Sequence, residues 1–275
     1  MSFLEKYLIE PFKYATSDWL KVLIVILLLG IPIVIISISL IAYIKLNFST
    51  FILTLGMGLL FFIITSMAIT GYYIGVVKNT LKGLDTLPDW SNFIEILKDG
   101  VLYVVAVFIL NLVVYLPAIL LLIIGIFFTG TIVTVDSFEH SDLWTIITSL
   151  LLYILVLLLY MLVVSIVLAI YIPLATVNFA KKGFFGFFKF SDVLKKISLE
   201  YILILLLYFL INFILNFILQ TTIKIINIIV SMIDIFIYII AVLIYIVCGT
   251  VISFILEIMS YRAVTKYYIE REREQ

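Results

Sequence analysis

The stretch GYYIGVVKNTLKGLDTLPDWSNFIEILKDG, residues 71–100, is the longest polar interval in the first half of the chain and joins two strongly apolar runs. The paired tyrosines near its start are typical of a bilayer interface. Gly83 indicates the end of a helix, and Pro88 biases the residue before it toward an extended conformation. Asp89 or Ser91 is then expected to cap a new helix. The stretch therefore predicts a helix end, a turn and a second helix start.

The second helix of this stretch has one apolar face, made of Phe93, Ile94, Leu97 and Val101. Its polar residues lie elsewhere around the axis, and Trp90 stands at its start. This pattern predicts a short amphipathic helix at the membrane surface, before the next span begins. The alternative is an ordinary polar loop with a chance helical pattern.

Composition sets the class of the protein. The chain has 275 residues, of which 65% are hydrophobic and 12% charged, with a mean hydropathy of +1.35. Apolar runs of about 20 or more residues recur, and each is long enough to cross a bilayer. A β-barrel would show short alternating segments instead. The sequence predicts an all-α, polytopic membrane helix bundle, whose zero net charge offers no basic field for nucleic acid.

Six transmembrane helices are expected, paired as three hairpins in one integral membrane domain, residues 1–275. Five of them cover residues 22–44, 50–77, 101–128, 201–223 and 235–260. The fourth in chain order is a long span that opens at residues 141–144 and ends at residue 177. Of the 17 lysines and arginines, 15 fall in alternate intervals between these spans. The positive-inside rule then places both termini and both long polar intervals in the cytoplasm, and the chain in the cell membrane.

A shift of 100 residues relates the two long polar intervals. It aligns Lys82 and Gly83 with Lys182 and Gly183, and residues 90–97 with 190–197. Three parallel repeat units are therefore predicted, residues 12–77, 90–177 and 190–262, each with a surface helix, a hairpin and an aromatic, basic exit. The alternative is that apolar sequence of low complexity aligns with itself by chance.

Several residues of the opening stretch also occur in a known family. A Gly-Tyr pair precedes a turn that carries lysine, and after it come Gly83, Pro88, Trp90 and Gly100. This pattern resembles the archaeal and bacterial membrane family called domain of unknown function 4013. Residues 12–21 are similar to the start of that family. The resemblance implies a multi-pass fold and brings no catalytic residues.

The second polar interval, residues 178–200, is basic and rich in phenylalanine, and Ser191 and Asp192 are expected to cap a helix there. Its lysines are candidate contacts for anionic lipid head groups in the bilayer. They are Lys181, Lys182, Lys189, Lys195 and Lys196. The alternative is that these charges only orient the chain in the membrane.

Glu257 is the only acidic residue well inside an apolar span, so it is expected to face the bundle rather than lipid. Ser253 and Tyr261 lie one turn away on the same helical face. A tyrosine such as Tyr72 or Tyr171 is the predicted partner. Two roles stay open, a polar clamp between hairpins and a proton- or cation-coupled function.

Three asparagines also lie inside predicted spans, and Asn212 and Asn216 share one helical face. Hydrogen bonding between helices is one role for them and for Asn111. Lining a solute path is the other. A cavity at bilayer depth bounded by these side chains would favour the path.

The chain offers little for metal or acid–base chemistry. Its one histidine, His140, lies in an acidic loop with Asp136, Glu139 and Asp142, which either holds a divalent cation or is simply solvated. Its one cysteine, Cys248, is expected to be a buried, inert thiol. We expect no catalytic residues, no metal and no cofactor.

Two functions remain from the sequence. The first is a non-catalytic membrane protein, an accessory, lipid-interacting or partner-binding subunit. The alternative is a small-solute permease, favoured by the intramembrane asparagines and by spans carrying Pro32, Pro117 and Pro173. An enzyme is not expected, and protein partners or self-association stay open.

Overall fold

The computed structural model describes residues 2–45, 47–133, 140–230 and 235–274. In these ranges the chain forms eight α-helices and no strand. The chain divides into two compact units, residues 1–104 with 173–275, called here unit 1, and residues 105–172, called unit 2. The expected all-α class is confirmed.

Six of the described helices are long and apolar enough to cross a bilayer. They are α2 (Trp19–Lys45), α3 (Phe48–Leu81), α4 (Phe93–Val133), α5 (His140–Lys182), α7 (Leu199–Val230) and α8 (Ile235–Arg273). The remaining elements are short, namely η1 (Glu5–Ile9), α1 (Glu10–Ala15), η2 (Trp90–Asn92), η3 (Phe184–Phe188) and α6 (Phe190–Leu194). A multi-pass membrane protein is therefore the correct class.

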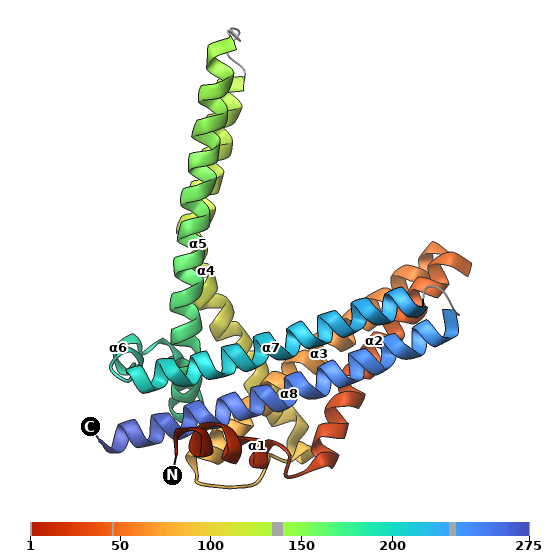
Figure 1. The fold of residues 1–275 in the computed structure, drawn as a ribbon, viewed down its shortest axis with the longest axis vertical. Coiled ribbons are helices and arrows are strands. Elements are labelled where there is room, and N and C mark those ends of the chain that lie inside the picture. The colour runs from red at the N-terminus through yellow and green to blue at the C-terminus, as the bar shows by residue number, and fades with distance from the viewer. Residues whose placement is uncertain (1, 46, 134–139, 231–234, 275) are drawn as a thin grey trace. The chain divides into compact units, whose positions relative to one another are not determined.

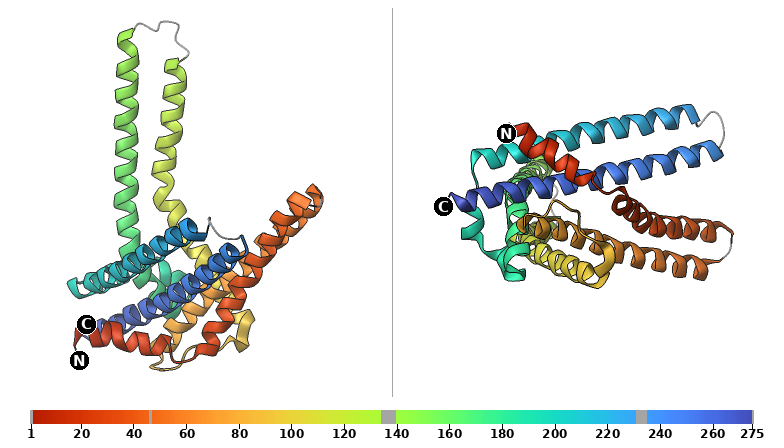
Figure 2. Two further views of the ribbon diagram at one scale, coloured as in Figure 1. Left: turned by 45° about the vertical axis from the view of Figure 1, so that its right-hand side comes forward. Right: turned by 90° about the horizontal axis from the view of Figure 1, so that it is seen from below.

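Unit 1 is built around α8. Helices α2 and α3 form one antiparallel hairpin, α7 and α8 form another, and α8 also packs on α3 and α1 (Figures 1 and 2). Both chain ends lie at the same end of this unit (Figure 1). The largest fully buried side chains there include five tyrosines, Tyr7, Tyr72, Tyr201, Tyr267 and Tyr268. Buried tyrosine lets one side chain fill apolar space and still hydrogen-bond at its tip.

The two ends of residues 71–100 meet in space. A Cβ added to Gly71 would overlap the carbonyl oxygen of Ile96, and one added to Gly100 would overlap that of Met67. Helices α3 and α4 therefore cross backbone against backbone, as small residues allow in membranes. The chain between them folds back, so that a Cβ on Gly75 would lie 3.1 Å from Pro88. These glycines fix the geometry of the stretch.

Helices α3 and α5 end in the same way. Gly83 follows α3 with φ of +73°, and Gly183 follows α5 with φ of +76°. Both have a positive φ, which glycine adopts without a Cβ penalty, and Gly183 combines it with an extended ψ of −169°. The shared helix ending agrees with the 100-residue alignment at these two positions. The boundaries of the three repeat units stay a prediction.

Two local expectations are wrong. Residues 93–100 do not form a separate surface helix, because α4 runs without interruption from Phe93 and Gly100 marks the crossing with α3 rather than a helix end. The expected caps also have other partners. The Asp89 side chain makes no cap and pairs with Lys21 at 2.7 Å. Asp192 lies inside α6 and pairs with Lys182 at 2.7 Å.

Unit 2 is a hairpin of the second part of α4 and the first part of α5, seen side by side in Figure 2. Tyrosine hydroxyls join the two helices. Tyr160 donates to the Val114 carbonyl oxygen at 2.6 Å, and the hydroxyls of Tyr115 and Ser165 lie 3.2 Å apart. Such bonds hold helices together in apolar surroundings, where packing alone gives little specificity.

Candidate functional site

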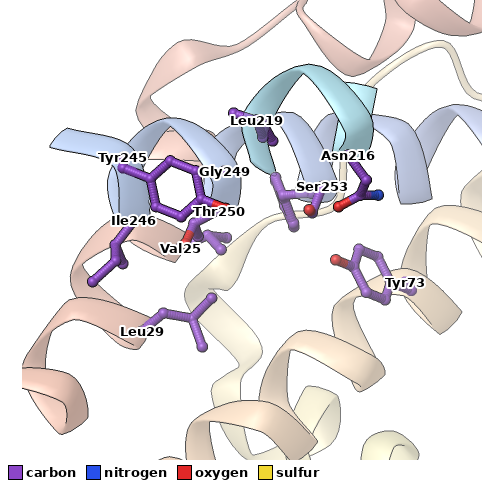
Figure 3. Close-up of a pocket in the computed structure, with 11 residues that line it drawn as sticks. Val25, Leu29, Tyr73, Asn216, Leu219, Tyr245, Ile246, Gly249, Thr250 and Ser253 are labelled. Carbon is purple, nitrogen blue, oxygen red and sulfur yellow. The ribbon is translucent and has the colours of Figure 1, made fainter. Parts of the chain in front are cut away.

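A cavity of about 340 Å³ lies within unit 1, among helices α2, α3, α7 and α8 (Figure 3). Its apolar lining includes Val25 and Leu29 from α2 and Leu219 from α7. Its polar lining consists of four hydroxyls and one amide, from Tyr73, Tyr245, Thr250, Ser253 and Asn216. The contributing parts of these helices belong to the apolar candidate spans. The cavity therefore has both apolar and polar groups in its lining, and it lies between helices at the depth of the predicted membrane spans.

Helix α8 supplies one wall of the cavity by its periodicity. Ile246, Thr250 and Ser253 recur at spacings of four and three, which places them on one stripe of the helix. Gly249 also lines the cavity, and a Cβ added there would meet no atom within 4 Å. The missing side chain at residue 249 thus leaves part of the space open.

Asn216 is the only one of the three predicted asparagines that lines this cavity. Its amide nitrogen donates to the Asn212 carbonyl oxygen at 2.9 Å and also to the Asn212 side-chain oxygen. Asn212 therefore orients Asn216 from the preceding turn. Asn111 lies in unit 2 and donates to the Val107 carbonyl oxygen of its own helix at 2.8 Å. Of the two roles considered for these asparagines, Asn216 fits the lining of a cavity, and the bond of Asn111 stays within its own helix.

Glu257 lies one turn of α8 beyond Ser253, on the same stripe. Its carboxylate interacts electrostatically with the phenols of Tyr73, Tyr103 and Tyr261. Tyr73 also lines the cavity, so it connects Glu257 with that space. The Glu257 side chain is nevertheless exposed at the surface of the protein. Within the described ranges it forms no ion pair. A carboxylate without a cation is costly in apolar surroundings.

The two tyrosines predicted as partners of Glu257, Tyr72 and Tyr171, lie in different units. Tyr72 is fully buried and stacks on Trp90, with ring centres 4.4 Å apart. Both Tyr72 and Tyr73 pack on Phe254 of α8 with ring centres 5.6 Å apart, and Tyr73 also stacks on Tyr261 at 5.4 Å. Tyr171 belongs to unit 2. The expected stripe of Ser253, Glu257 and Tyr261 on α8 is consistent with the geometry.

A buried arginine organises the charged end of unit 1. Arg262 is only 2% exposed and donates to Glu10 at 2.9 Å, to Asp85, and to the Leu84 carbonyl oxygen at 2.9 Å. Its guanidinium lies 4.2 Å from the centre of the Tyr14 ring. Burial raises the pKa of Tyr14 to about 12. Arg262 thereby joins α1, the turn after α3 and α8.

The five lysines predicted to contact lipid differ in their surroundings. Lys181 pairs with Glu272 at 2.5 Å and Lys182 with Asp192 at 2.7 Å. Lys196 is 5% exposed and lies 4.4 Å from the centre of the Tyr268 ring, so it does not fit a lipid contact. Burial lowers the pKa of Lys196. Lys189 and Lys195 are exposed.

Large apolar side chains are exposed beside these two lysines. Phe185 is 79% exposed, and Phe190 and Leu194 are also open to the surroundings. We call Phe185, Lys189, Phe190, Leu194 and Lys195 the aromatic–basic segment. Such a mixture of exposed aromatics and cations suits a membrane interface.

The predicted acidic loop lies largely outside the described residues. Asp136 and Glu139 are not described, and neither are the side chains of His140 and Asp142. Among the side chains that are described, no three histidine, cysteine or acidic groups come together as a metal site. Cys248 is exposed on α8, so the expected burial of this thiol is wrong.

Residues 59–223 match the family described as protein of unknown function DUF4013. The chain belongs to this family. It is 30% identical to protein MJ0233 of Methanocaldococcus jannaschii over 230 residues, which are 81% of this chain and 78% of that protein. It is 31% identical to protein MJ1189 of the same organism over 230 residues, 82% of this chain and 76% of that one. Both relatives are described as uncharacterized, and no solved structure matches the chain.

The DUF4013 match divides the candidate site. It includes the Gly71–Gly100 crossing, Tyr73 and Asn216, and ends before α8. Glu257, Ser253 and Asn216 could be singled out from the sequence, because they are polar residues in apolar runs. Tyr73, Tyr245 and Thr250 were missed, because tyrosine and threonine are common in such runs and only the tertiary structure brings them to one cavity.

Proposed function

We propose that this DUF4013 protein is a non-catalytic membrane protein that binds anionic lipid at a membrane surface through its aromatic–basic segment. The observation that supports the proposal is the exposure of Lys189 and Lys195 beside Phe185, Phe190 and Leu194. The phenylalanines suit the boundary between head groups and acyl chains, and the ammonium groups suit phosphate. Partner binding at the same surface is compatible with this role.

The side of the membrane is part of the proposal. We place both termini and the aromatic–basic segment on the cytoplasmic face of the cell membrane, since the lysines and arginines concentrate there under the positive-inside rule. The two chain ends lie at one end of unit 1, which supports a common side (Figure 1).

Lipid retention tests the proposed binding. The double variant Lys189→Gln/Lys195→Gln removes the two exposed ammonium groups, each contributing roughly 1 kcal/mol near an anionic surface. In nanodiscs of mixed anionic and zwitterionic lipid, the variant should bind anionic lipid about thirtyfold more weakly than the wild type, measured as lipid retained in native mass spectrometry. The control is Lys224→Gln, an exposed lysine on α7 away from the segment. Equal retention by all three proteins would contradict the proposal.

The cavity favours a second candidate function, a small-solute permease. Asn216 and the four hydroxyls would line part of a path through unit 1. Gly249→Leu fills the cavity from a position where added atoms meet open space. If the chain is a permease, this variant should stop uptake of its solute into proteoliposomes while its lipid retention stays unchanged.

A further inference from the structure

The cavity beside Glu257 combines three properties that are rarely found together in an apolar span. Its wall holds the aromatic rings of Tyr73, Tyr245 and Phe254. Its hydroxyl and amide groups add polar contacts. A carboxylate without a cationic partner among the described residues lies one turn further along α8. Each property narrows the chemistry of a ligand that would bind there.

The aromatic rings favour a cation with an apolar surface. Tyr73 and Phe254 pack on each other with ring centres 5.6 Å apart, and the Tyr245 ring lies on the opposite side of the cavity from Tyr73 (Figure 3). Ring faces attract ammonium groups, most strongly where water is excluded. A small inorganic cation would instead require several oxygen ligands. The rings therefore favour an alkylammonium group.

The carboxylate supplies the opposite charge. Glu257 does not line the cavity itself, but it lies one turn of α8 beyond Ser253, which does, and on the same stripe of the helix. Arg262, the next cation along α8, is committed to Glu10 and Asp85. A bound cation would offset the unfavourable charge that Glu257 carries in an apolar span.

The size of the space limits the ligand. A cavity of about 340 Å³ lies at the lower end of the usual range for small-molecule sites. We infer that the cavity of unit 1 binds a small organic cation, with its ammonium group against the tyrosine rings and paired with Glu257. This inference does not depend on the proposed lipid binding, which uses a different surface.

A matched pair of probes tests the inference. Choline carries a quaternary ammonium, and 3,3-dimethylbutan-1-ol has the same shape with carbon in place of nitrogen. Purified full-length protein is titrated with each compound in isothermal titration calorimetry. Choline should bind, and the neutral alcohol should bind at least about tenfold more weakly, because it lacks the charge that the rings and Glu257 attract. Equal affinity for both compounds, or no binding of choline, would overturn the inference.

Two variants locate the site. Glu257→Gln keeps the size of the side chain and should weaken choline binding at least about tenfold. Gly249→Leu should abolish choline binding by filling the cavity, and it keeps the test decisive if the first variant fails to fold. The control Gly56→Ala, on α3 where added atoms also meet open space, should bind choline as the wild type does. Wild-type affinity in both Glu257→Gln and Gly249→Leu would refute the site.

Discussion

The crossing of α3 and α4 at Gly71 and Gly100 predicts a large effect from a single methyl group. In Gly71→Ala the new Cβ would overlap the backbone carbonyl of Ile96, which cannot rotate away as a flexible side chain would. The two helices must then separate. Overpacking of this kind lowers the free energy of unfolding by about 1–3 kcal/mol and occasionally more. Because the clash is with backbone, we expect a loss of about 3 kcal/mol for Gly71→Ala.

The same helix offers a control of opposite sign. Gly56 lies on α3, where an added Cβ would meet nothing within 4 Å. Alanine is a better helix former than glycine by roughly 0.5–1 kcal/mol, so Gly56→Ala should be neutral or stabilising. The two identical substitutions on one helix should therefore differ by about 3–4 kcal/mol.

Unfolding in mixed micelles of mild detergent and increasing SDS measures this difference. Tryptophan emission is a suitable signal, because Trp90 stacks on Tyr72 next to the crossing. Gly100→Ala should behave as Gly71→Ala does. The double variant should cost less than the sum, since the first methyl already opens the crossing. If Gly71→Ala and Gly56→Ala shift the midpoint equally, the close crossing is refuted.

Three further predictions follow from the charged residues and the topology. Arg262→Met should destabilise the protein by about 1.5–3 kcal/mol in the same assay, because the buried guanidinium loses its charged hydrogen bonds to Glu10 and Asp85, although Glu10 keeps Lys266 at 2.7 Å; a loss below about 1 kcal/mol would contradict the buried pairing. In a chain without its native cysteine, a cysteine at Ser91 should react with an impermeant reagent from the cytoplasmic side and one at Ser137 from the outside; labelling of both from one side would refute six spans. The hydrogen bond from Lys182 lowers the pKa of Asp192 below its ordinary 3.8, so this pair stabilises the fold above that pH and loses its effect as pH falls through the lower folded value. In Lys182→Met this contribution is lost, so stability should fall less steeply as the pH is lowered below 3.8. The same dependence of stability on pH in the variant and the wild type would contradict the pairing.

Much of the fold could be predicted from the sequence. Span number and helix class follow from apolar runs, because length and hydropathy are set locally. The helix end at Gly83 was also predictable, since glycine tolerates left-handed backbone. The role of Gly100 was not, because a crossing depends on a helix distant in sequence and the same glycine also resembles a helix boundary.

The candidate site was predictable only in part. Glu257 and Asn216 are conspicuous as polar residues in apolar runs. The choice between Tyr72 and Tyr73 was not accessible, because neighbours on a helix point about 100° apart and only packing fixes the rotation of α3. Asp89 and Asp192 are good caps by type, and each is recruited instead by a lysine from another segment.

The pairing of Glu10 with Arg262 joins groups separated by 252 positions in the chain. At a synthesis rate of roughly 5–20 residues per second, the glutamate leaves the ribosome on the order of tens of seconds before its arginine. Until then Glu10 and Asp85 stay hydrated, and α1 has no α8 to pack against. The first short helix made is thus among the last to reach its place, so the charged end of unit 1 closes only after every span has been inserted.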